Sequence, residues 1–451
     1  MRIAIIGSGI SGLSAAWLLN ERHDIMLYEA EDRLSGHSHT VDVPSPRGDI
    51  PVDTGFIVYN EQTYPNLTAM FEHLDVPTRA SNMSFGVSID QGRFEYAGSE
   101  TFGALFAQKR NLFSPRFQRM LFDIARFKTA ARRHLRGEDE RNEATIDDFL
   151  SQGGFGHTFT HRYFLPMCAA IWSSSLESMR AFPARSLLRF FDNHGLLNIL
   201  TRPIWRTVVG GSRVYVDKLS APLCKRTHTA CPVRRVSRSG DKVLVIDGRD
   251  QPQSFDAVVL ACHADQAMRL LATPSTAERD VLGAFRYQTN RAVLHHDPDL
   301  MPVRRDVWSS WNYLSNAGAS GSAAASVTYW LDHLQGIATD RPILLSLNPL
   351  APPREDMTIA EFSYDHPQFD RDALKAQARL SEIQGRDRIW FAGAHWGYGF
   401  HEDGLLSGLH VAAGLGVTPP WWSNVTSLRP LPARASLLQL AYRPAAMAAS
   451  D

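Results

Sequence analysis

The chain has 451 residues, of which 44% are hydrophobic, so it can bury a large core and is expected to form at least two lobes. Lysine plus arginine equal aspartate plus glutamate at 47 each, and this zero net charge excludes recruitment of nucleic acid by an overall positive field. The four cysteines lack the spacing of a metal site or a disulfide scaffold, which favours reduced thiols in the cytoplasm.

The first residues have the pattern of a dinucleotide-binding strand, turn and helix. A short apolar strand over 3–6 leads into Gly7, Gly9 and Gly12, which have the spacing GxGxxG, and an apolar helix follows. One glycine permits the tight turn, the next lets the backbone approach a pyrophosphate, and the third lets helix and strand pack closely. The pyrophosphate would meet the free N–H groups of the first helical turn, where Ser11 lies.

A second expected strand, residues 24–28, ends at Glu29. An acid about twenty residues beyond the glycines is where a carboxylate receives a ribose hydroxyl. Together the two segments predict a dinucleotide site in a Rossmann-like fold.

The segment EAEDRLSGHSHT, residues 29–40, resembles the flavin amine-oxidase superfamily, in which the ribose-binding acid leads into an arginine and a glycine pair. Arg33, Gly36 and Thr40 match that pattern, whereas Ser35 replaces the first glycine and His37 the usual following arginine. The resemblance implies FAD as the cofactor. Attachment through a late cysteine is excluded because no cysteine follows Cys262, so we expect FAD to be non-covalent.

The same resemblance extends to distant segments. VDTGF, residues 52–56, matches the next flavin-side turn and includes Gly55, and Val233 belongs to the implied cofactor contacts. FAG and GLLSGLHVAAG, within residues 391–414, resemble the closing strand and helix, so Gly393 would pass the ribityl chain. Amides near Gly404 and Leu405 would then stabilise negative charge on the reduced ring. Asp403 would cap a helix starting at Gly404 or contact the ribityl chain.

The expected fold class is α/β: a Rossmann-like FAD-binding domain of amine-oxidase type with a discontinuous α+β substrate domain. We place the FAD-binding domain at 1–80, 205–272 and 385–416, the substrate domain at 81–204 and 273–384, and a tail at 417–451. Strands are expected within RAVLHH, SVTYWL and ILLSL of the substrate domain, which begin at residues 291, 326 and 343.

A closer resemblance rests on five longer strings: HHDPDLMP (295–302), WSSWNY (308–313), TYWLDHLQ (328–335), SLNP (346–349) and GYGFHEDG (397–404). They resemble the N-terminal flavoprotein half of plant cyclopropane fatty acid synthases and its stand-alone bacterial relatives. The resemblance implies action on an unsaturated or modified fatty acyl lipid, and it suggests a cyclopropane-synthase-like methyltransferase as a partner.

The favoured reaction moves a hydride from an acyl carbon to flavin N5, either with removal of a neighbouring proton or with return of the hydride elsewhere. His401 and Glu402 are the first candidates for the proton acceptor and His295 the next; alternatively, the loop residues only shape the loop and cap the helix. The interval between Lys242 and Lys375 contains no lysine, which counts against amine oxidation. An amine oxidase, a carotenoid-type desaturase and a non-catalytic flavoprotein partner of the methyltransferase stay open.

Residues 105–137 carry nine lysines and arginines with Asp123 as their one acid, and from Phe113 onward apolar residues recur at helical spacing. Such a basic amphipathic helix can lie on an anionic membrane. The alternative is a substrate-domain helix with a solvated basic face. No stretch is long and apolar enough to span a bilayer, so we expect a cytoplasmic protein. Peripheral binding to the inner face of the membrane is one of the two alternatives for this helix.

Overall fold

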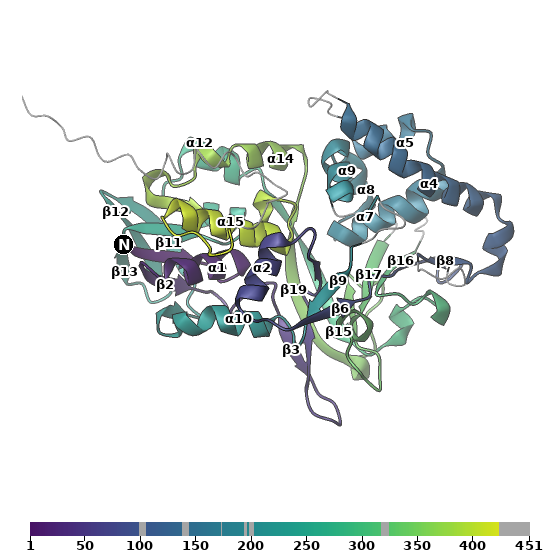
Figure 1. Ribbon diagram of the computed structural model, residues 1–451, viewed down its shortest axis with the longest axis horizontal. Coiled ribbons are helices and arrows are strands. Elements are labelled where there is room, and N and C mark those ends of the chain that lie inside the picture. The colour runs from purple at the N-terminus through teal and green to yellow at the C-terminus, as the bar shows by residue number, and fades with distance from the viewer. Residues whose placement is uncertain are drawn as a thin grey trace, which may run out of the picture.

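Two large sheets organise the chain (Figure 1). The computed structural model describes residues 1–98, 105–137, 144–172, 174–193, 196–197, 203–316 and 324–423. Most of the tail expected over 417–451 therefore lies outside the described residues.

The first sheet is parallel, and its strands come from segments far apart in the sequence. Their order is β10 (Thr227–His228), β2 (Asp24–Tyr28), β1 (Arg2–Ile6), β14 (Ala257–Leu260) and β20 (Ile389–Phe391). Ile3 and Ile5 pack in one core cluster, whereas Ala4 and Ile6 pack in another. Both faces of the sheet are therefore covered, as the continuous apolar strands require.

Helices cover each face of this sheet. On one side lie α1 (Ile10–Leu19), α15 (His401–Gly414), α2 (Pro65–His73) and α10 (Arg213–Ser220). On the other lie α11 (Ala264–Leu270), α12 (Thr276–Leu282), α14 (Arg371–Ala378) and the antiparallel meander β11 (Val233–Ser239), β12 (Lys242–Asp247) and β13 (Pro252–Phe255).

The second sheet is mixed, with the order β19 (Thr358–Gln368), β15 (Arg286–His295), β18 (Leu344–Leu347), β17 (Ala324–Trp330), β16 (Trp311–Asn316), β7 (Phe85–Ile89) and β8 (Phe94–Ala97). The expected strands of the substrate domain are β15, β17 and β18. Smaller pieces join the two sheets: the hairpin β3 (Thr40–Val43) and β4 (Ile50–Asp53), the helix α13 (Leu331–Gln335), and a sheet of β5 (Tyr59–Asn60), β9 (Trp205–Val208) and β6 (Thr78–Ser81).

A helical lobe packs against the second sheet and lies apart from the first (Figure 1). It contains α4 (Pro115–Arg136), α5 (Ile146–Gln152), α6 (His157–Phe159), α7 (Leu165–Trp172), α8 (Leu176–Ala181) and α9 (Ala184–Asn193).

The apolar face of α4 belongs to this lobe. Phe117, Met120, Phe127 and Ala131 are buried in its core, so the structure corrects the idea that this face lies on a membrane. Asp123 is buried as well. Within the described residues, none of the helices has the length and apolar character needed to cross a bilayer.

Candidate flavin site

The glycine turn after β1 has one open position between two closely packed ones. Gly7 has φ +101°, and a Cβ there would lie 2.5 Å from the carbonyl oxygen of Ala261. A Cβ at Gly12 would collide with the carbonyl of Gly7. At Gly9 a Cβ would meet nothing within 4 Å. The turn therefore presents bare backbone at Gly9, beside the N-terminus of α1, as a pyrophosphate site requires.

Glu29 lies at the end of β2, beside this turn. Its Oε2 accepts hydrogen bonds from the backbone N–H (2.9 Å) and hydroxyl (2.6 Å) of Ser8, and Oε1 accepts from the N–H of Glu31 (3.0 Å). A carboxylate has about four acceptor positions, so one is left for a ribose hydroxyl. The N–H of Cys231 donates to the Glu29 carbonyl, which brings Val233 at the start of β11 to the same edge.

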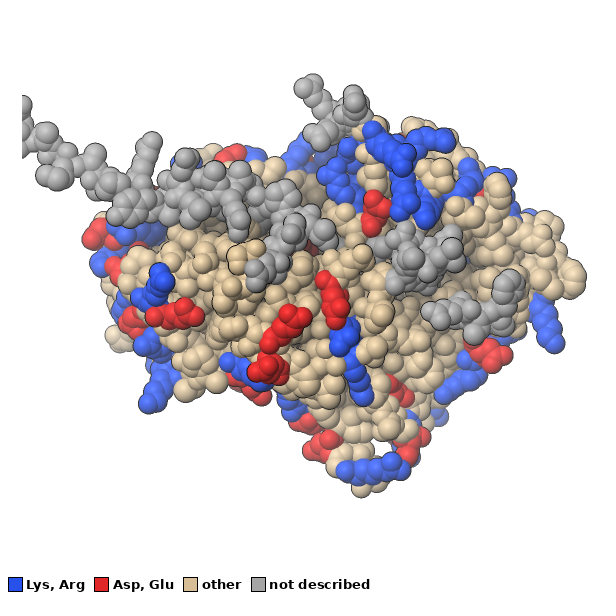
Figure 2. Space-filling model, in the orientation of Figure 1, with Lys and Arg blue, Asp and Glu red and all other residues tan. Residues whose placement is uncertain are grey.

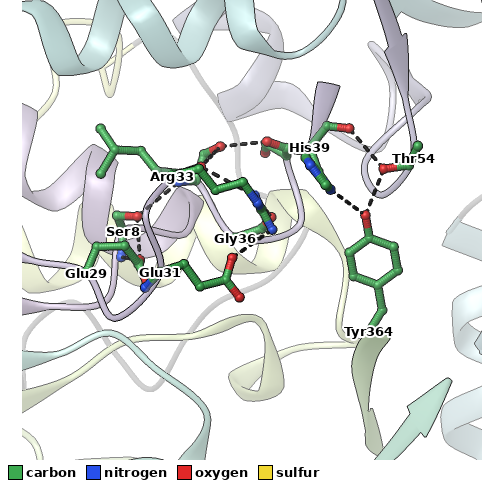
Figure 3. Close-up of polar contacts among 11 residues, drawn as sticks. Ser8, Glu29, Glu31, Arg33, Gly36, His39, Thr54 and Tyr364 are labelled. Atoms are coloured by element: carbon green, nitrogen blue, oxygen red, sulfur yellow. Dashed lines mark hydrogen bonds and ion pairs between the residues drawn. The ribbon is translucent and has the colours of Figure 1, made fainter. Parts of the chain in front are cut away.

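The loop after Glu29 folds back over the glycine turn (Figure 3). Arg33 donates from Nη1 to the carbonyl of Gly36 (2.8 Å) and pairs with Glu31 at 3.0 Å, which holds the loop closed. Gly36 has φ +53°, and a Cβ there would lie 3.5 Å from the Cα of Gly9. Arg33 therefore acts on the shape of the loop, while Gly36 lies directly against the open turn.

A second turn, at Gly55, packs against the end of that loop at His37. The N–H of Phe56 donates to the carbonyl of His37 (2.7 Å), and a Cβ at Gly55 would collide with that same carbonyl. Beside them, the hydroxyl of Tyr364 on β19 is hydrogen-bonded to His39 Nδ1 (2.9 Å) and to Thr54 Oγ1 (2.7 Å), as Figure 3 shows. This contact joins the flavin-side loops to the second sheet.

Histidines from separate elements surround His37. Its ring lies 5.2 Å from Tyr364, 5.4 Å from His366 and 6.5 Å from His263. His263 follows β14 and stacks on Tyr287 at 4.3 Å. Burial lowers the pKa of His37 well below its usual value and that of His366 to about 4, so both rings are neutral at pH 7. His37 Nε2 is buried and has no hydrogen-bond partner among the described residues.

The sequence did not point to His263, His366, Tyr364 or Tyr215 as site residues. His263 had a usable signal, because it directly follows a buried parallel strand, where ligands of α/β sheets bind. The others lie on strands or helices whose local pattern indicates only burial.

The closing helix α15 begins at His401, three residues earlier than predicted. The N–H of Gly404 already donates to the carbonyl of Phe400 at 3.1 Å, so the amides left free at the helix start belong to His401–Asp403 rather than to Gly404 and Leu405. The Leu405 side chain is fully buried in the core beside the first sheet.

Asp403 closes the loop that precedes this helix. Its Oδ2 accepts from the N–H groups of Tyr398 (2.9 Å) and Phe400 (3.0 Å), which is half of a capping box. Of its two predicted roles, the structure therefore shows capping, of a helix that starts at His401.

Close contact between α1 and α15 fixes the helix start beside the glycine turn. A Cβ at Gly404 would lie 3.2 Å from the hydroxyl of Ser11, and one at Gly408 would collide with the Ser11 carbonyl. Gly393, at the end of β20, donates its N–H to Ser407 Oγ (2.8 Å). These positions meet at one edge of the first sheet, where the glycine turn also lies.

His401 lies flat on Phe56, with ring centroids 3.9 Å apart and 11° between the planes. Its Nε2 is 2.7 Å from the hydroxyl of Tyr215, which also contacts Ser38 Oγ. Burial lowers the pKa of His401 to about 3, so the ring is neutral at pH 7 and a weak base.

Glu402 points away from His401, to the N-terminus of α2. Oε1 accepts from the N–H (2.9 Å) and side-chain amide (2.8 Å) of Asn66, and Oε2 accepts from the N–H of Leu67 (2.9 Å). Burial raises the pKa of Glu402 to about 7, although these hydrogen bonds lower it. The geometry is that of a carboxylate capping a helix, which favours the structural alternative for this residue.

His295 lies outside the candidate flavin site. Tyr287, which stacks on His263, is near the start of β15, whereas His295 is at the other end, about 26 Å away along the strand. Its ring is fully buried and bonded to Ser346 Oγ (2.9 Å) and to the N–H of Asp297 (3.0 Å). The structure therefore corrects the prediction that His295 supplies a base.

The residues present fit FAD. The bare backbone at Gly9 faces open space, Glu29 keeps an acceptor position, and the buried His37 Nε2 has no hydrogen-bond partner within the part of the chain that the structure describes. In the order of the cofactor, Glu29 would meet the adenosine ribose, Gly9 the pyrophosphate and His37 the flavin end.

Comparisons with known proteins also point to a flavin cofactor. Residues 10–294 match the family of flavin containing amine oxidoreductases. No curated protein matches the chain.

Three similar solved structures cover 92% of this chain. They are a CLA-producing fatty acid isomerase from P. acnes (16% identity, 99% of that chain, TM-score 0.65), cyclohexylamine oxidase from Brevibacterium oxydans IH-35A (14%, 98%, 0.65) and a putative protoporphyrinogen oxidase from Exiguobacterium sp. (14%, 98%, 0.64). At such identities the likeness shows the fold alone, and it confirms the predicted fold class. The narrower resemblance to cyclopropane fatty acid synthases stays a prediction.

The family match covers more than half of the chain. The glycine turn after β1 and the start of α15, from opposite ends of the chain, together form the site that a flavin dinucleotide needs. The protein therefore belongs to the flavin-containing amine oxidoreductase family and is an FAD-dependent oxidoreductase.

Proposed function

We propose that this oxidoreductase acts on the hydrocarbon part of an unsaturated or methyl- or cyclopropane-modified fatty acyl chain. The observation that carries the proposal is an aromatic wall next to His401. Phe400 stacks on Phe190 (5.1 Å, 16°), and Phe190 meets Tyr398 edge to face at 5.5 Å. Phe362 of β19 meets the ring of His39 at 4.8 Å. Because Tyr398, Phe400 and Phe362 are only half-buried, they offer apolar surface to a ligand.

Bound FAD supplies an acceptor that takes a hydride from carbon and can return it. Desaturation also removes a proton from the neighbouring carbon, so it needs a base. Rearrangement, in which the hydride returns to a different carbon of the same chain and the double bond moves, is redox-neutral and needs no base.

The protonation states favour rearrangement. His401 is a weak base because burial lowers its pKa to about 3, and Glu402 is engaged by three N–H donors of α2. His39, beside Phe362, has a pKa lowered to about 4 by burial. Neutral rings of this kind orient a substrate and exclude water, and they hold a proton poorly at pH 7. A fatty acid isomerase has the same fold, so the fold is compatible with rearrangement, as it is with amine oxidation.

The test is an anaerobic incubation of the holoprotein in D2O with a polyunsaturated free fatty acid. We expect a positional isomer without lasting loss of flavin colour, with no solvent deuterium except at the carbon that receives the hydride, because a hydrogen on N5 can exchange with solvent. A product that lacks two hydrogens, formed with one equivalent of bleached flavin, would replace rearrangement by desaturation. Solvent deuterium at any other carbon would overturn the base-free reaction.

Matched variants test the loop residues in the same assay. His401→Ala and Glu402→Gln should both keep turnover within about tenfold of wild type if neither handles a proton, whereas loss of an essential base costs roughly 100-fold or more. Peroxide release with amines in air would favour an amine oxidase instead. A flavin that no lipid, polyene or amine reduces would favour a non-catalytic partner of a methyltransferase.

A further inference from the structure

An exposed apolar tip lies where α4 begins. A short helical turn, η1 (Lys109–Phe113), precedes α4 and leaves Leu112 47% and Phe113 81% exposed. Phe122, two turns into α4, is 61% exposed. The side-chain amide of Gln118 donates to the carbonyl of Leu112 (2.8 Å), so Leu112 and Phe122 lie on either side of Gln118 along one solvent-facing strip.

Basic residues surround this tip. Lys109, Arg110, Arg116 and Arg119 are all exposed, and the guanidinium of Arg119 lies 5.7 Å from the ring of Phe122. Figure 2 shows further basic side chains over the helical lobe that contains α4, chiefly on the part of the lobe nearest the middle of the view rather than at this tip.

The one acid of residues 105–137 does not oppose this charge at the surface. Asp123 is fully buried and accepts from Arg126 (2.6 Å), Arg119 (3.2 Å) and the N–H of Gly156 (2.8 Å). Asp123 therefore offsets the charge of Arg119 and Arg126 from within the lobe, and the basic character of the exposed strip rests on Lys109, Arg110 and Arg116.

A loop from the second sheet extends the same surface. The carbonyl of Gly92 accepts from both Gln108 Nε2 (2.8 Å) and Arg304 Nη1 (3.0 Å), and Arg110 donates to Gln108. Val303, the neighbour of Arg304, is 70% exposed beside Gly92. Exposed Asp306 is the nearest surface acid on this loop.

We propose that this tip, formed by Lys109, Arg110, Leu112, Phe113, Arg116, Arg119, Phe122 and Val303, docks on an anionic lipid bilayer; Arg304 takes no part because it pairs with buried Glu95 at 2.7 Å. The aromatic and aliphatic side chains enter the headgroup region, while the basic side chains meet anionic headgroups. The buried face of α4 takes no part. The proposal goes beyond the proposed function, because it concerns where the protein binds and not what it converts.

The basic side chains of the tip favour an anionic bilayer over a second copy of the chain as its partner. A two-fold contact through this tip would place basic side chains against the same basic side chains, which repel. An anionic surface attracts them all at once, and it accepts a convex, protruding phenylalanine without a matching pocket.

The test is co-sedimentation of the holoprotein with vesicles of phosphatidylcholine alone or with 30% phosphatidylglycerol, a fraction on the order needed for a clearly negative surface. We expect binding to the anionic vesicles that falls with added salt. Phe113→Ser should weaken it about tenfold through lost apolar burial. Arg110→Gln and Arg116→Gln should weaken it about fivefold each.

Two matched controls change the same chemistry elsewhere. Ile204→Ser alters a side chain that is 71% exposed outside the tip, and Arg47→Gln removes an exposed charge on the β3–β4 hairpin. Both should bind like wild type. No binding by the wild type, equal binding to neutral vesicles, or equal loss in the controls would overturn the proposal. Co-sedimentation needs no turnover, so its result tests membrane binding independently of the proposed acyl substrate.

Discussion

Exchanging Gly9 for alanine should separate FAD binding from folding. Gly9 has φ −57° and ψ 173°, which alanine adopts without strain, and its Cβ would meet nothing within 4 Å. Alanine at such a position stabilises a fold by up to about 1 kcal/mol, because it lowers the entropy of the unfolded chain. The stability of the apoprotein should therefore be unchanged or slightly higher.

FAD affinity should fall in the same variant. The added methyl group would occupy the space through which the pyrophosphate approaches the backbone. Loss of one hydrogen bond to a charged group costs about 1.5–3 kcal/mol. The Kd for FAD should therefore rise about 10- to 150-fold.

Gly12→Ala is the contrasting variant, since its Cβ would collide with the carbonyl of Gly7. Overpacking of this kind costs about 1–3 kcal/mol, so apoprotein stability and FAD affinity should fall together. Flavin fluorescence titration of apoprotein measures the Kd, and urea unfolding measures stability. If Gly9→Ala binds FAD like wild type, the pyrophosphate does not lie against Gly9.

Three further predictions concern carboxylates. Glu29→Ala should weaken FAD binding by about 1–3 kcal/mol, measured by the same titration, because the ribose hydrogen bond to a charged acceptor is lost. Unchanged affinity would give Glu29 another role. Glu402 has a pKa of about 7 in the native state against 4.5 in the unfolded state, so between these pH values the native state binds more protons. The free energy of unfolding should therefore fall by about 3 kcal/mol as pH rises from 5 to 8. Urea unfolding should show Glu402→Gln with a flatter pH dependence, and an identical slope would contradict the assignment. Asp123→Asn should lower the free energy of unfolding by about 2–4 kcal/mol in that assay, because it breaks a buried ion pair with Arg126. Asp192→Asn breaks an exposed ion pair with Arg132 and should cost under about 1 kcal/mol. Equal losses would mean that the burial of Asp123 is unimportant.

Local signals in the sequence predicted the cofactor cradle well. The turn at Gly7–Gly12 and the acid at Glu29 sit within one strand–helix–strand unit, so short-range spacing carries the information. His263 and Tyr364 are different. Both rings lie beside His37, although the three residues are more than ninety positions apart in sequence. Such a contact depends on the tertiary fold, so no local pattern in the sequence indicates it.

The start of α15 was misplaced for a physical reason that the sequence does contain. Gly404 was taken as the first helical position, although glycine is a poor helix former and the acids lie before it. An acidic pair such as Glu402 and Asp403 is typical of a first turn, where negative charge meets the positive helix end.

The apolar periodicity of α4 does not distinguish a core helix from a membrane-surface helix. Apolar residues recur with the same spacing in a core helix and in a helix on a membrane. Only burial separates the two, and in the structure Phe117 and Phe127 face the core while Phe113 and Phe122 face solvent. The apolar side chains available to a membrane therefore lie at the start of α4 and not along its buried face.

The two departures from the family pattern lie in one loop and have different consequences. Ser35 adopts φ +80°, which glycine would take more easily, but its N–H bonds to Ser8 Oγ (2.9 Å) and its hydroxyl donates to the Ser38 carbonyl (2.6 Å). These bonds offset the strain, so the turn keeps its shape. His37 changes the electrostatics instead, because a buried neutral ring stands where the pattern has a permanent positive charge. A site with one cation fewer attracts anionic groups less, and a neutral ring leaves no charge to be desolvated when an apolar group packs beside it.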